Sequence, residues 1–487
     1  MERLSPPDLE TIELLPASAA VLPTETPAKI SKQALRRSLK ASTLDGVLAV
    51  IFNSVTGGVL LTKFLLEVGA GPLEIGLLSS IPMLLNLLQP LGAYIAERTT
   101  SRHNYCLQTF GPSRLIWLIL ALGIAWVSWS NANPHLLVGL TLGIVFATNI
   151  LAVLGSPSWV SWMAVLVPHR LRGRYFGLRN SAGSLTNLLI VPLLGFAVSA
   201  WPSGTTQGYG VVLFAGVLAG LVSLGFQFFM VDVNPQIPLA TIPSKLRKTE
   251  GTGETLVPPV LSEVRVFKDT NFLKFLLYFG FWTFAVNLSA PFFNLYLLDN
   301  LGLDLGWVTL YTSLTSGANL VMLVLWGKLA DRVGNRPLLL LVGVLVAVTP
   351  LFWLGTGTES VSLWVWLPLL HLLSGGTWAA VDLCNSNIQM ELAPGEHPST
   401  YFAIAAAVAG VSGGLGTTAG GFLAQLEHLG GLPGLFAISA GVRLIALLPL
   451  VFVREQRSQP VVQVLRKLLS FKSRPAIEAL GIADQAQ

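Results

Sequence analysis

The sequence predicts an all-α integral membrane protein of twelve transmembrane helices arranged as two six-helix halves, and three observations lead to this fold class. The chain of 487 residues is 52% hydrophobic and only 11% charged, whereas soluble proteins carry about 25% charged residues. Lipid must therefore surround most of the chain. Its apolar residues fall into twelve runs of membrane-spanning length. Its Lys and Arg residues gather in alternate loops and in both tails.

Each run approaches or exceeds the length of about 20 apolar residues that a helix needs to cross the hydrocarbon core. In the first half the runs are 44–66, 72–96, 107–129, 136–165, 177–200 and 210–231. In the second half they are 271–298, 307–327, 338–355, 362–391, 399–424 and 433–453. The runs divide the chain into an N-terminal tail (1–42), a first bundle (43–231), a polar linker (232–270), a second bundle (271–453) and a basic C-terminal tail (454–487). Within that last tail, residues 461–474 mix apolar with basic residues, which is typical of an amphipathic helix on a membrane surface; a solvated tail is the alternative.

The distribution of Lys and Arg predicts the orientation of the helices. An even number of spans puts both termini on one side, and the side rich in Lys and Arg is normally the cytoplasm. The tails, the linker and alternate loops collect these residues, whereas the opposite loops carry acids such as Glu67, Asp304 and Glu427. We therefore expect both termini in the cytoplasm and the protein in the plasma or inner membrane. Because the net charge of +5 is dispersed over many loops, the sequence argues against a nucleic-acid-binding patch.

An internal repeat relates the two halves. The fourth run of each half is followed by a proline and, seven residues later, by a Tyr-Phe pair: Pro168 with Tyr175 and Phe176, and Pro394 with Tyr401 and Phe402. The second run of each half ends in a glycine followed by an acid-Arg pair: Gly92 with Glu97 and Arg98, and Gly327 with Asp331 and Arg332. The offsets of about 226 to 235 residues indicate a parallel repeat of six helices, which is a known plan of transporters.

The run 327–336, GKLADRVGNR, resembles the loop signature that the major facilitator superfamily carries between helices eight and nine. The copy after the second run, from Gly92 to Arg98, is degraded: it has one extra residue, Glu97 in place of Asp, and no later glycine. The resemblance covers roughly residues 40–455. It implies two halves related by a pseudo-twofold axis, transport by alternating access, and a pathway lined mainly by helices one, four, seven and ten.

Each residue of the stronger signature has an expected physical role. Gly327 should let two helices approach closely, and Gly334 should adopt a positive φ in a tight turn. Asp331 should accept hydrogen bonds from N–H groups at a helix N-terminus and pair with an Arg, which would latch the cytoplasmic side. Arg332 and Arg336 should bind lipid phosphates. The alternative is a short basic loop without a latch.

Polar side chains within the runs are the candidates for the transport pathway, because they are costly in lipid. Asp382 in the tenth run is the strongest candidate, since a desolvated carboxylate can carry a proton; a hydrogen-bonded structural Asp is the alternative. His371 can titrate near neutrality, although a packing role is more common. On the helices that the resemblance implies, the candidate cavity amides are Asn53, Asn149, Asn287 and Asn385, with interhelical hydrogen bonding as the alternative for each.

Three other charges in the runs are interpreted mainly as structural. Asp45 is expected near the N-terminus of the first helix, where the helix dipole favours an acid. Arg114 is expected to pair with an acid or to extend toward the interface, and Arg443 requires a partner that the sequence does not name. The eleventh run contains glycines at spacings that let helices touch and slide, with plain tight packing as the alternative: Gly410, Gly413, Gly414, Gly416, Gly420 and Gly421.

Together these observations predict a secondary transporter without enzymatic activity. The sequence contains no phosphate-binding loop, zinc-protease motif or nucleophile elbow, and it implies no cofactor and no metal site. The scarcity of buried charge favours a small neutral, amphipathic or hydrophobic solute; the working hypothesis is export in exchange for protons by a monomer. The main rival is a non-transporting membrane assembly factor or a pigment or lipid carrier with the same fold. A membrane enzyme is the second rival, but no cluster of catalytic residues supports it.

Overall fold

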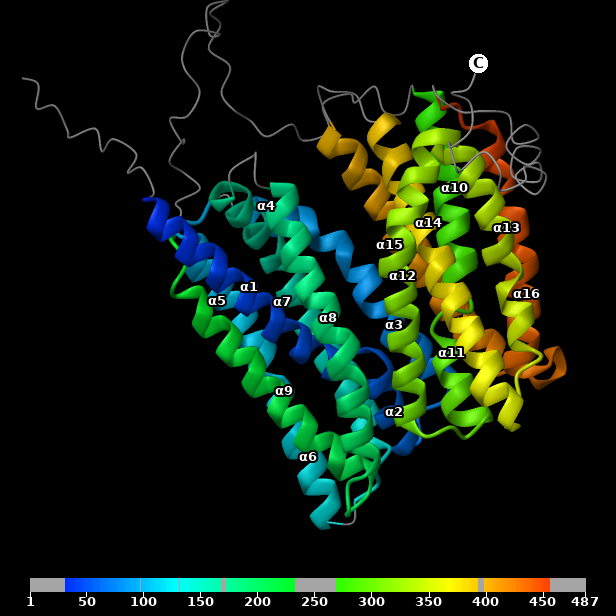
Figure 1. The fold of residues 1–487 in the computed structure, drawn as a ribbon. Coiled ribbons are helices and arrows are strands. Elements are labelled where there is room, and N and C mark those ends of the chain that lie inside the picture. The colour runs from blue at the N-terminus through cyan, green and yellow to red at the C-terminus, as the bar shows by residue number, and fades with distance from the viewer. Residues whose placement is uncertain are drawn as a thin grey trace, which may run out of the picture.

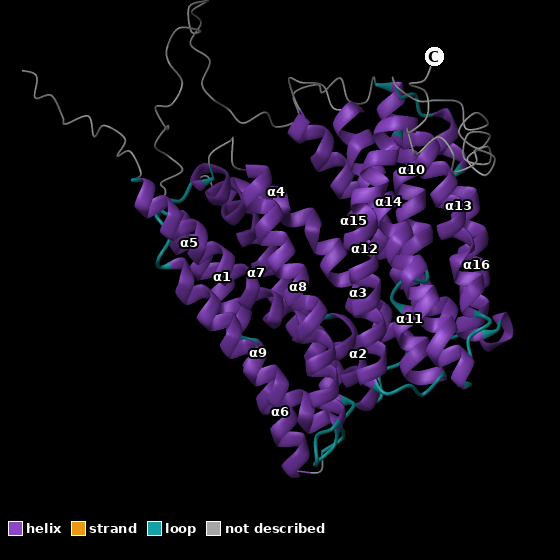
Figure 2. Cartoon of the chain, in the orientation of Figure 1, coloured by secondary structure: helices purple, strands orange, loops and turns teal. Residues whose placement is uncertain are grey.

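The computed structural model describes residues 31–96, 98–130, 132–167, 172–232, 269–392 and 398–455. All regular secondary structure in these ranges is helical (Figure 2). The predicted linker lies outside the described residues except at its ends, as do the basic segment 461–474, Pro168, Pro394 and Glu97. The all-α prediction is thus confirmed for the described part of the chain.

The first half contains six spans, three of which are interrupted helices. Their elements are α1 (Lys32–Val55) with α2 (Gly58–Glu67), α3 (Pro72–Leu85) with α4 (Gln89–Ala96), α5 (Arg102–Leu115) with α6 (Trp117–Ser130), α7 (Leu136–Leu166), α8 (Arg172–Ser199) and α9 (Thr205–Gln227). The helix α1 begins earlier than the apolar run because Ser31 caps it, its Oγ accepting from the N–H of Ala34 at 3.1 Å.

The second half repeats this order of spans. Its elements are α10 (Thr270–Asn287) with α11 (Phe292–Leu295) and η5 (Tyr296–Asn300), α12 (Leu305–Val333), α13 (Asn335–Trp353), η6 (Ser362–Trp366) with α14 (Leu367–Leu392), α15 (Pro398–Ala424), and α16 (Gly431–Ala446) with η8 (Leu448–Phe452). Eleven helical segments in the described ranges are long and apolar enough to cross a membrane. The remaining long helix is α15, which has 27 residues and is rich in glycine, serine and threonine, residues that lower its hydropathy.

The two sets of helices form separate bundles that meet near one end and diverge toward the other (Figure 1). They diverge at the end where α1 and α10 begin. The helix α3 packs on α15, and α8 packs on α12. In the second pair, Gly195 and Phe196 of α8 lie against Thr309 and Gly306 of α12. The first turns of α12 and the last turns of α8 therefore make this contact, which places it at the end where the bundles meet.

Glycine makes the α3–α15 contact close, as the sequence suggested for the eleventh run. A Cβ at Gly410 would lie 2.8 Å from the carbonyl oxygen of Met83, and one at Gly421 would lie 3.1 Å from Cα of Leu73. A different set of glycines on α15 faces α10: a Cβ at Gly416 would lie 2.5 Å from the carbonyl oxygen of Phe284. Small residues thus let α15 approach two neighbours at backbone distance.

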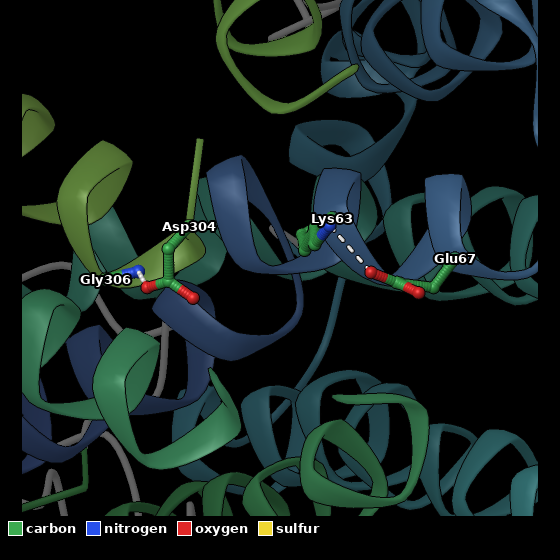
Figure 3. Close-up of polar contacts among 4 residues, drawn as sticks. All are labelled: Lys63, Glu67, Asp304 and Gly306. Atoms are coloured by element: carbon green, nitrogen blue, oxygen red, sulfur yellow. Dashed lines mark hydrogen bonds and ion pairs between the residues drawn. The ribbon is translucent and has the colours of Figure 1, made fainter. Parts of the chain in front are cut away.

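The charged residues on α2 and at the start of α12 make their polar contacts within their own half (Figure 3). On α2, Lys63 Nζ lies 2.6 Å from Glu67 Oε1. At the start of α12, Asp304 Oδ1 accepts from the N–H of Gly306 at 2.7 Å and caps the helix. Apolar packing instead joins the halves here, because one core cluster combines residues such as Leu65 and Val198 with Phe292 and Leu305.

Candidate functional site

The first span of each half is broken at corresponding positions. The chain between α1 and α2 is extended at Gly57, and Gly58 has a φ of +61°, a conformation that glycine adopts without steric cost. In the second half α10 ends at Asn287, and the chain resumes as α11 after Pro291, which cannot donate a backbone hydrogen bond. Paired breaks in repeat-related helices are a typical position for a transporter's binding site, because irregular backbone within the membrane is tolerated where it lines a cavity.

A cavity of about 400 Å³ lies at these two breaks. Its walls come from α1, α2, α3, α5, α6 and α7 of the first half, and Pro291 and Asn294 come from the second half. Three amides converge on it from three different spans: Asn53, Asn149 and Asn294. Hydroxyl groups and aromatic rings complete the lining, and no described lining residue carries an ionisable side chain. The cavity can therefore hold an uncharged molecule by hydrogen bonds and apolar contacts.

A second cavity of about 650 Å³ adjoins the first, with which it shares Asn53, Gly57 and Gly58. It carries one charge, that of Arg179 on α8. The Arg179 guanidinium lies over the Trp159 ring at 4.6 Å from the centroid, and its Nε donates to the carbonyl oxygen of Ser42 at 3.3 Å. Thr312 of α12 lines this cavity too, so both cavities have walls from both halves.

The structure brings two of the four predicted amides together at the smaller cavity. Asn53 is exposed to the space of both cavities, and Asn149 lines the smaller one while its Nδ2 donates to the carbonyl oxygen of Val145 at 2.8 Å. Asn287 and Asn385 line neither cavity. Asn287 donates to the carbonyl oxygen of Thr283 at 2.8 Å, and Asn385 is buried and accepts from the Tyr278 hydroxyl at 3.3 Å. These two asparagines therefore make the hydrogen bonds, within a helix or between helices, that were the alternative to a cavity contact.

The two predicted titratable candidates lie apart from the cavities. His371 is buried, with Nδ1 at 2.8 Å from the carbonyl oxygen of Leu367 and its ring stacked on Tyr311; these contacts are those of a packing residue. Asp382 projects from α14 with an exposed side chain, and no residue in the described part of the chain hydrogen-bonds or pairs with its carboxylate. Its role in proton transfer stays a prediction.

Of the two glycines in the loop signature, one has the expected conformation and the other lacks the expected helix contact. Gly334 has a φ of +94° between α12 and α13, as predicted. The close approach predicted at Gly327 is wrong, because a Cβ there would lie 4.0 Å from the nearest side chain, that of Leu383. The degraded copy has this property instead: a Cβ at Gly92 would lie 2.7 Å from the carbonyl oxygen of Leu154 on α7.

Glu455 makes hydrogen bonds to a helix N-terminus of the kind that the sequence analysis expected for an acid of the signature. It accepts from the backbone N–H groups of Asn335 and Arg336, each at 2.8 Å, at the N-terminus of α13. The side chain of Asp331 lies outside the described residues. The Arg336 guanidinium donates to the carbonyl oxygens of Leu450 and Val451, so it is held by protein groups.

The remaining arginines of the signature lie at helix ends. Arg332 is exposed in the last turn of α12, where the helix dipole favours a cation. Arg98 follows α4; its guanidinium lies over the Tyr94 ring at 3.3 Å from the centroid and donates to the Tyr94 carbonyl oxygen at 3.2 Å. Binding of lipid phosphate by these arginines stays a prediction.

Buried charges outside the cavities are held by networks within each half. The sequence predicted Asp45 near the start of the first helix, and this is wrong. Asp45 lies in the middle of α1, because that helix begins at Lys32. It is buried and accepts from the Ser223 hydroxyl and the Gln227 amide. Arg443 is 2% exposed and donates to the carbonyl oxygens of Val346 and Val286 and to the hydroxyl of Ser289. Backbone carbonyls and this hydroxyl are thus the partners that the sequence did not name.

Sequence reasoning missed Asn294 and Arg179 as cavity residues. Asn294 lies three residues after Pro291, and a proline within an apolar run is the signal that marks such a break. For Arg179 the loop charge pattern was misleading, because its position is consistent with an ordinary cytoplasmic anchor. Only the packing of α8 beside α1 places its guanidinium at the cavity wall.

Comparisons with known proteins agree with this geometry. The sequence profile of the Major Facilitator Superfamily matches residues 46–417 and 291–482, whereas none of the curated proteins compared with the chain matches it. Similar solved structures include a bacterial homologue of the iron transporter ferroportin in an inward-facing state (15% identity, TM-score 0.63, 86% of this chain and 98% of that chain). They also include the inward-open xylose transporter XylE from E. coli (16%, 0.61, 89% and 99%) and the nucleoside transporter NupG (11%, 0.60, 86% and 98%).

These identities show likeness of fold alone, and the family rests on the profile match, which spans most of both helical halves. The predicted resemblance is thereby confirmed. The chain belongs to the Major Facilitator Superfamily.

Proposed function

We propose that this protein is a secondary transporter that carries a small uncharged solute by alternating access. The observation that supports the proposal best is the 400 Å³ cavity at the paired breaks of α1–α2 and α10–α11, with walls from both halves. Rocking of residues 40–231 against 271–455 would expose this cavity to each side of the membrane in turn. Solved structures of similar fold are named as transporters of xylose, nucleosides and iron.

The conformation supports an assignment of its open side. The halves are packed together through α3–α15 and α8–α12 at the end opposite the start of α1. Because the Lys and Arg distribution predicts both termini in the cytoplasm, the diverging end would face the cytoplasm. The membrane is then the plasma or inner membrane, and export begins with a solute entering from this side.

Flux through the purified protein tests the transport proposal. The protein reconstituted in vesicles should exchange a labelled solute that a thermal-shift screen of metabolites, sugars, drugs and lipids first identifies, since a ligand at 100 times its dissociation constant stabilises the fold by about 2.7 kcal/mol. Asn53→Ala should lower the exchange rate at solute concentrations near or below half-saturation, and Asn287→Ala, which changes an asparagine outside the cavity, should leave that rate unchanged. Equal exchange by the two variants would contradict the assignment of the site.

We propose Asp382 as the proton-carrying group. The support is chemical: it is an exposed carboxylate on a membrane-spanning helix, and no described residue pairs with it. Asp382→Asn should leave transport without a pH gradient unchanged and should abolish accumulation driven by a gradient, while Asp382→Glu should restore that accumulation. Unaltered gradient-driven accumulation in Asp382→Asn would refute this coupling.

The second candidate function is a membrane assembly factor or a pigment or lipid carrier with the same fold. Apolar surface exposed on both bundles, for example at Leu122, Val321 and Ile445, suits either lipid or a membrane partner. A stoichiometric partner that co-purifies with a protein inactive in every flux assay would favour this function over transport. No enzymatic role is proposed.

A further inference from the structure

We infer that the cavity at the break between α1 and α2 binds an uncharged, polyhydroxylated solute of about monosaccharide size. The inference rests on the proposed transport function and adds to it the chemical class of the ligand. It is carried by the kinds of hydrogen-bonding groups that remain available in the lining, by the apolar surfaces beside them, and by the size of the cavity.

A charged ligand would have no counter-charge in this cavity. None of the described residues that line it is ionisable, and an ion transferred from water without a partner is strongly disfavoured. Arg114 follows the lining residue Ser113, but its guanidinium donates to the carbonyl oxygen of Gly220 and lies 5.6 Å from the centroid of the Phe52 ring. Asp45, the buried acid nearest in sequence to the lining residues of α1, accepts a hydrogen bond from the Ser223 hydroxyl. The buried charges around the cavity thus already have partners.

Four of the five lining hydroxyls already donate to backbone carbonyl oxygens and act as acceptors toward a ligand. Thr56 and Thr62 donate to the carbonyl oxygens of Phe52 and Gly58, each at 3.0 Å, and Thr148 donates to its own helix at 2.8 Å. Because each hydroxyl has a single proton, only its oxygen lone pairs are left for a ligand. These four groups therefore require a ligand that donates hydrogen bonds, whereas the Ser79 hydroxyl, which makes no hydrogen bond in the described part of the chain, can donate or accept.

The asparagines add both donors and acceptors. Within the described part of the chain, the side chains of Asn53 and Asn294 make no hydrogen bond, so each offers two N–H donors and one carbonyl acceptor. Asn149 donates one N–H to Val145 and keeps its carbonyl oxygen. A ligand group that fits this mixture must donate to some neighbours and accept from others. The hydroxyl group does both, whereas a carboxylate only accepts and an ammonium only donates.

Apolar surfaces alternate with these polar groups. Trp117 and Phe52 are buried residues of the lining, and Pro291 and Pro82 lie in the wall as well. A ring or short chain of carbons that carries hydroxyls along its edge can place its C–H groups on such surfaces while its hydroxyls reach the amides. The volume of about 400 Å³ lies at the lower end of the range of about 300–1,000 Å³ for small-molecule sites, which suits a ligand of monosaccharide size.

Binding of size-matched probes tests the class. The full-length protein in detergent is titrated with the neutral polyols D-glucose, D-xylose and inositol, the anion gluconate, the cation glucosamine and the apolar ring cyclohexanol. At least one neutral polyol should raise the unfolding temperature saturably, and the two charged probes and cyclohexanol should not. If no polyol binds, or if gluconate, glucosamine or cyclohexanol binds more tightly than every polyol, the inference is overturned.

Variants locate the binding. Asn53→Ala and Asn294→Ala should each raise the half-saturating polyol concentration by about tenfold, as for a lost ligand hydrogen bond, whereas Asn287→Ala should leave it unchanged. The unfolding temperature without ligand verifies that each variant is folded. Because truncation can also act indirectly, Asn53→Asp provides a gain of function: its carboxylate should allow glucosamine to bind. Unchanged polyol affinity in both alanine variants would place the ligand elsewhere and refute the site.

Counterflow in vesicles separates this inference from the transport proposal. Saturable polyol binding without counterflow of the same polyol would support the ligand class and refute transport. Counterflow of a charged or apolar solute, lost in Asn53→Ala, would support transport and refute the polyol class.

Discussion

Replacing Gly76 by alanine should shift the protein away from the conformation described above. A Cβ at this position of α3 would lie 2.8 Å from the carbonyl oxygen of Thr417 and 3.3 Å from Cα of Gly421. Both contacted groups are backbone atoms of α15, in the other half, and they cannot rotate away as a side chain could. The clash exists only while α3 and α15 are packed together. A conformation in which the halves separate at this end would therefore be free of it.

The size of the shift follows from the geometry. An extra methyl group in a well-packed contact costs about 1–3 kcal/mol, and here that cost falls on one of two conformations. Such a difference changes their ratio by about 5- to 150-fold. The substitution should therefore raise the population in which the α3–α15 and α8–α12 contacts are open by this factor.

Cysteine labelling measures that population. Both native thiols, Cys106 and Cys384, are buried, and replacing them by serine gives a background without cysteines. Thr309 is fully buried where α12 meets α8, so Thr309→Cys should react with a polar maleimide only when the halves separate. Adding Gly76→Ala should raise the initial labelling rate by about 5- to 150-fold.

A matched control distinguishes rocking from general loosening. A Cβ at Gly92 would lie 2.7 Å from the carbonyl oxygen and 2.8 Å from Cα of Leu154, a backbone clash of similar closeness within the first half. Gly92→Ala should leave the labelling rate at position 309 unchanged. If Gly76→Ala labels no faster than this control, the halves do not separate at the α3–α15 contact and the reasoning is wrong.

Three further predictions concern stability. Arg443→Met should lower the free energy of unfolding by about 1–3 kcal/mol, because it removes the buried hydrogen bonds that the guanidinium donates to the carbonyl oxygens of Val346 and Val286 and to the Ser289 hydroxyl; thermal unfolding in detergent measures the loss, and an unchanged midpoint would contradict it. Glu455→Ala should cost about 0.5–2 kcal/mol through loss of a helix cap, and faster amide exchange at Asn335 than in the parent protein is the local readout. Asp45→Ala should destabilise the first half by a similar or larger amount than Arg443→Met, because a buried acceptor network loses its centre; proteolysis confined to the second half would argue against this.

Hydropathy and charge could predict the fold because lipid imposes a nearly uniform length and composition on every span. The same uniformity hides where a span is broken. Gly57 and Gly58 read as ordinary members of an apolar run, and the extended backbone at Gly57 is visible only in the structure. Asn294 was overlooked for this reason, since its position at the cavity depends on the break before α11.

The candidate site was predictable to the extent that helix number specifies a face of the bundle. Asn53 and Asn149 lie at the cavity, whereas Asn287 bonds to its own helix and Asn385 to Tyr278 of a neighbouring helix, although both were chosen by the same rule. An amide on a cavity-lining helix can satisfy itself on its own helix or on a neighbour, and sequence cannot distinguish these cases. The signature at 327–336 could not indicate that an acid capping α13 comes from Glu455, more than a hundred residues later in the chain.

The glycines that bring α3 and α15 to backbone distance also affect how much side-chain conformational entropy is lost when the halves close. Glycine has no rotamers to lose, so residues such as Gly76, Gly410 and Gly421 bury area without freezing side chains, whereas a long side chain loses about 1.5–2 kcal/mol of rotamer freedom on burial. At these glycine positions, closing and opening the contact thus changes side-chain entropy little. The temperature dependence of the conformational equilibrium should accordingly reflect chiefly the lipid and water that enter or leave the contact at these positions.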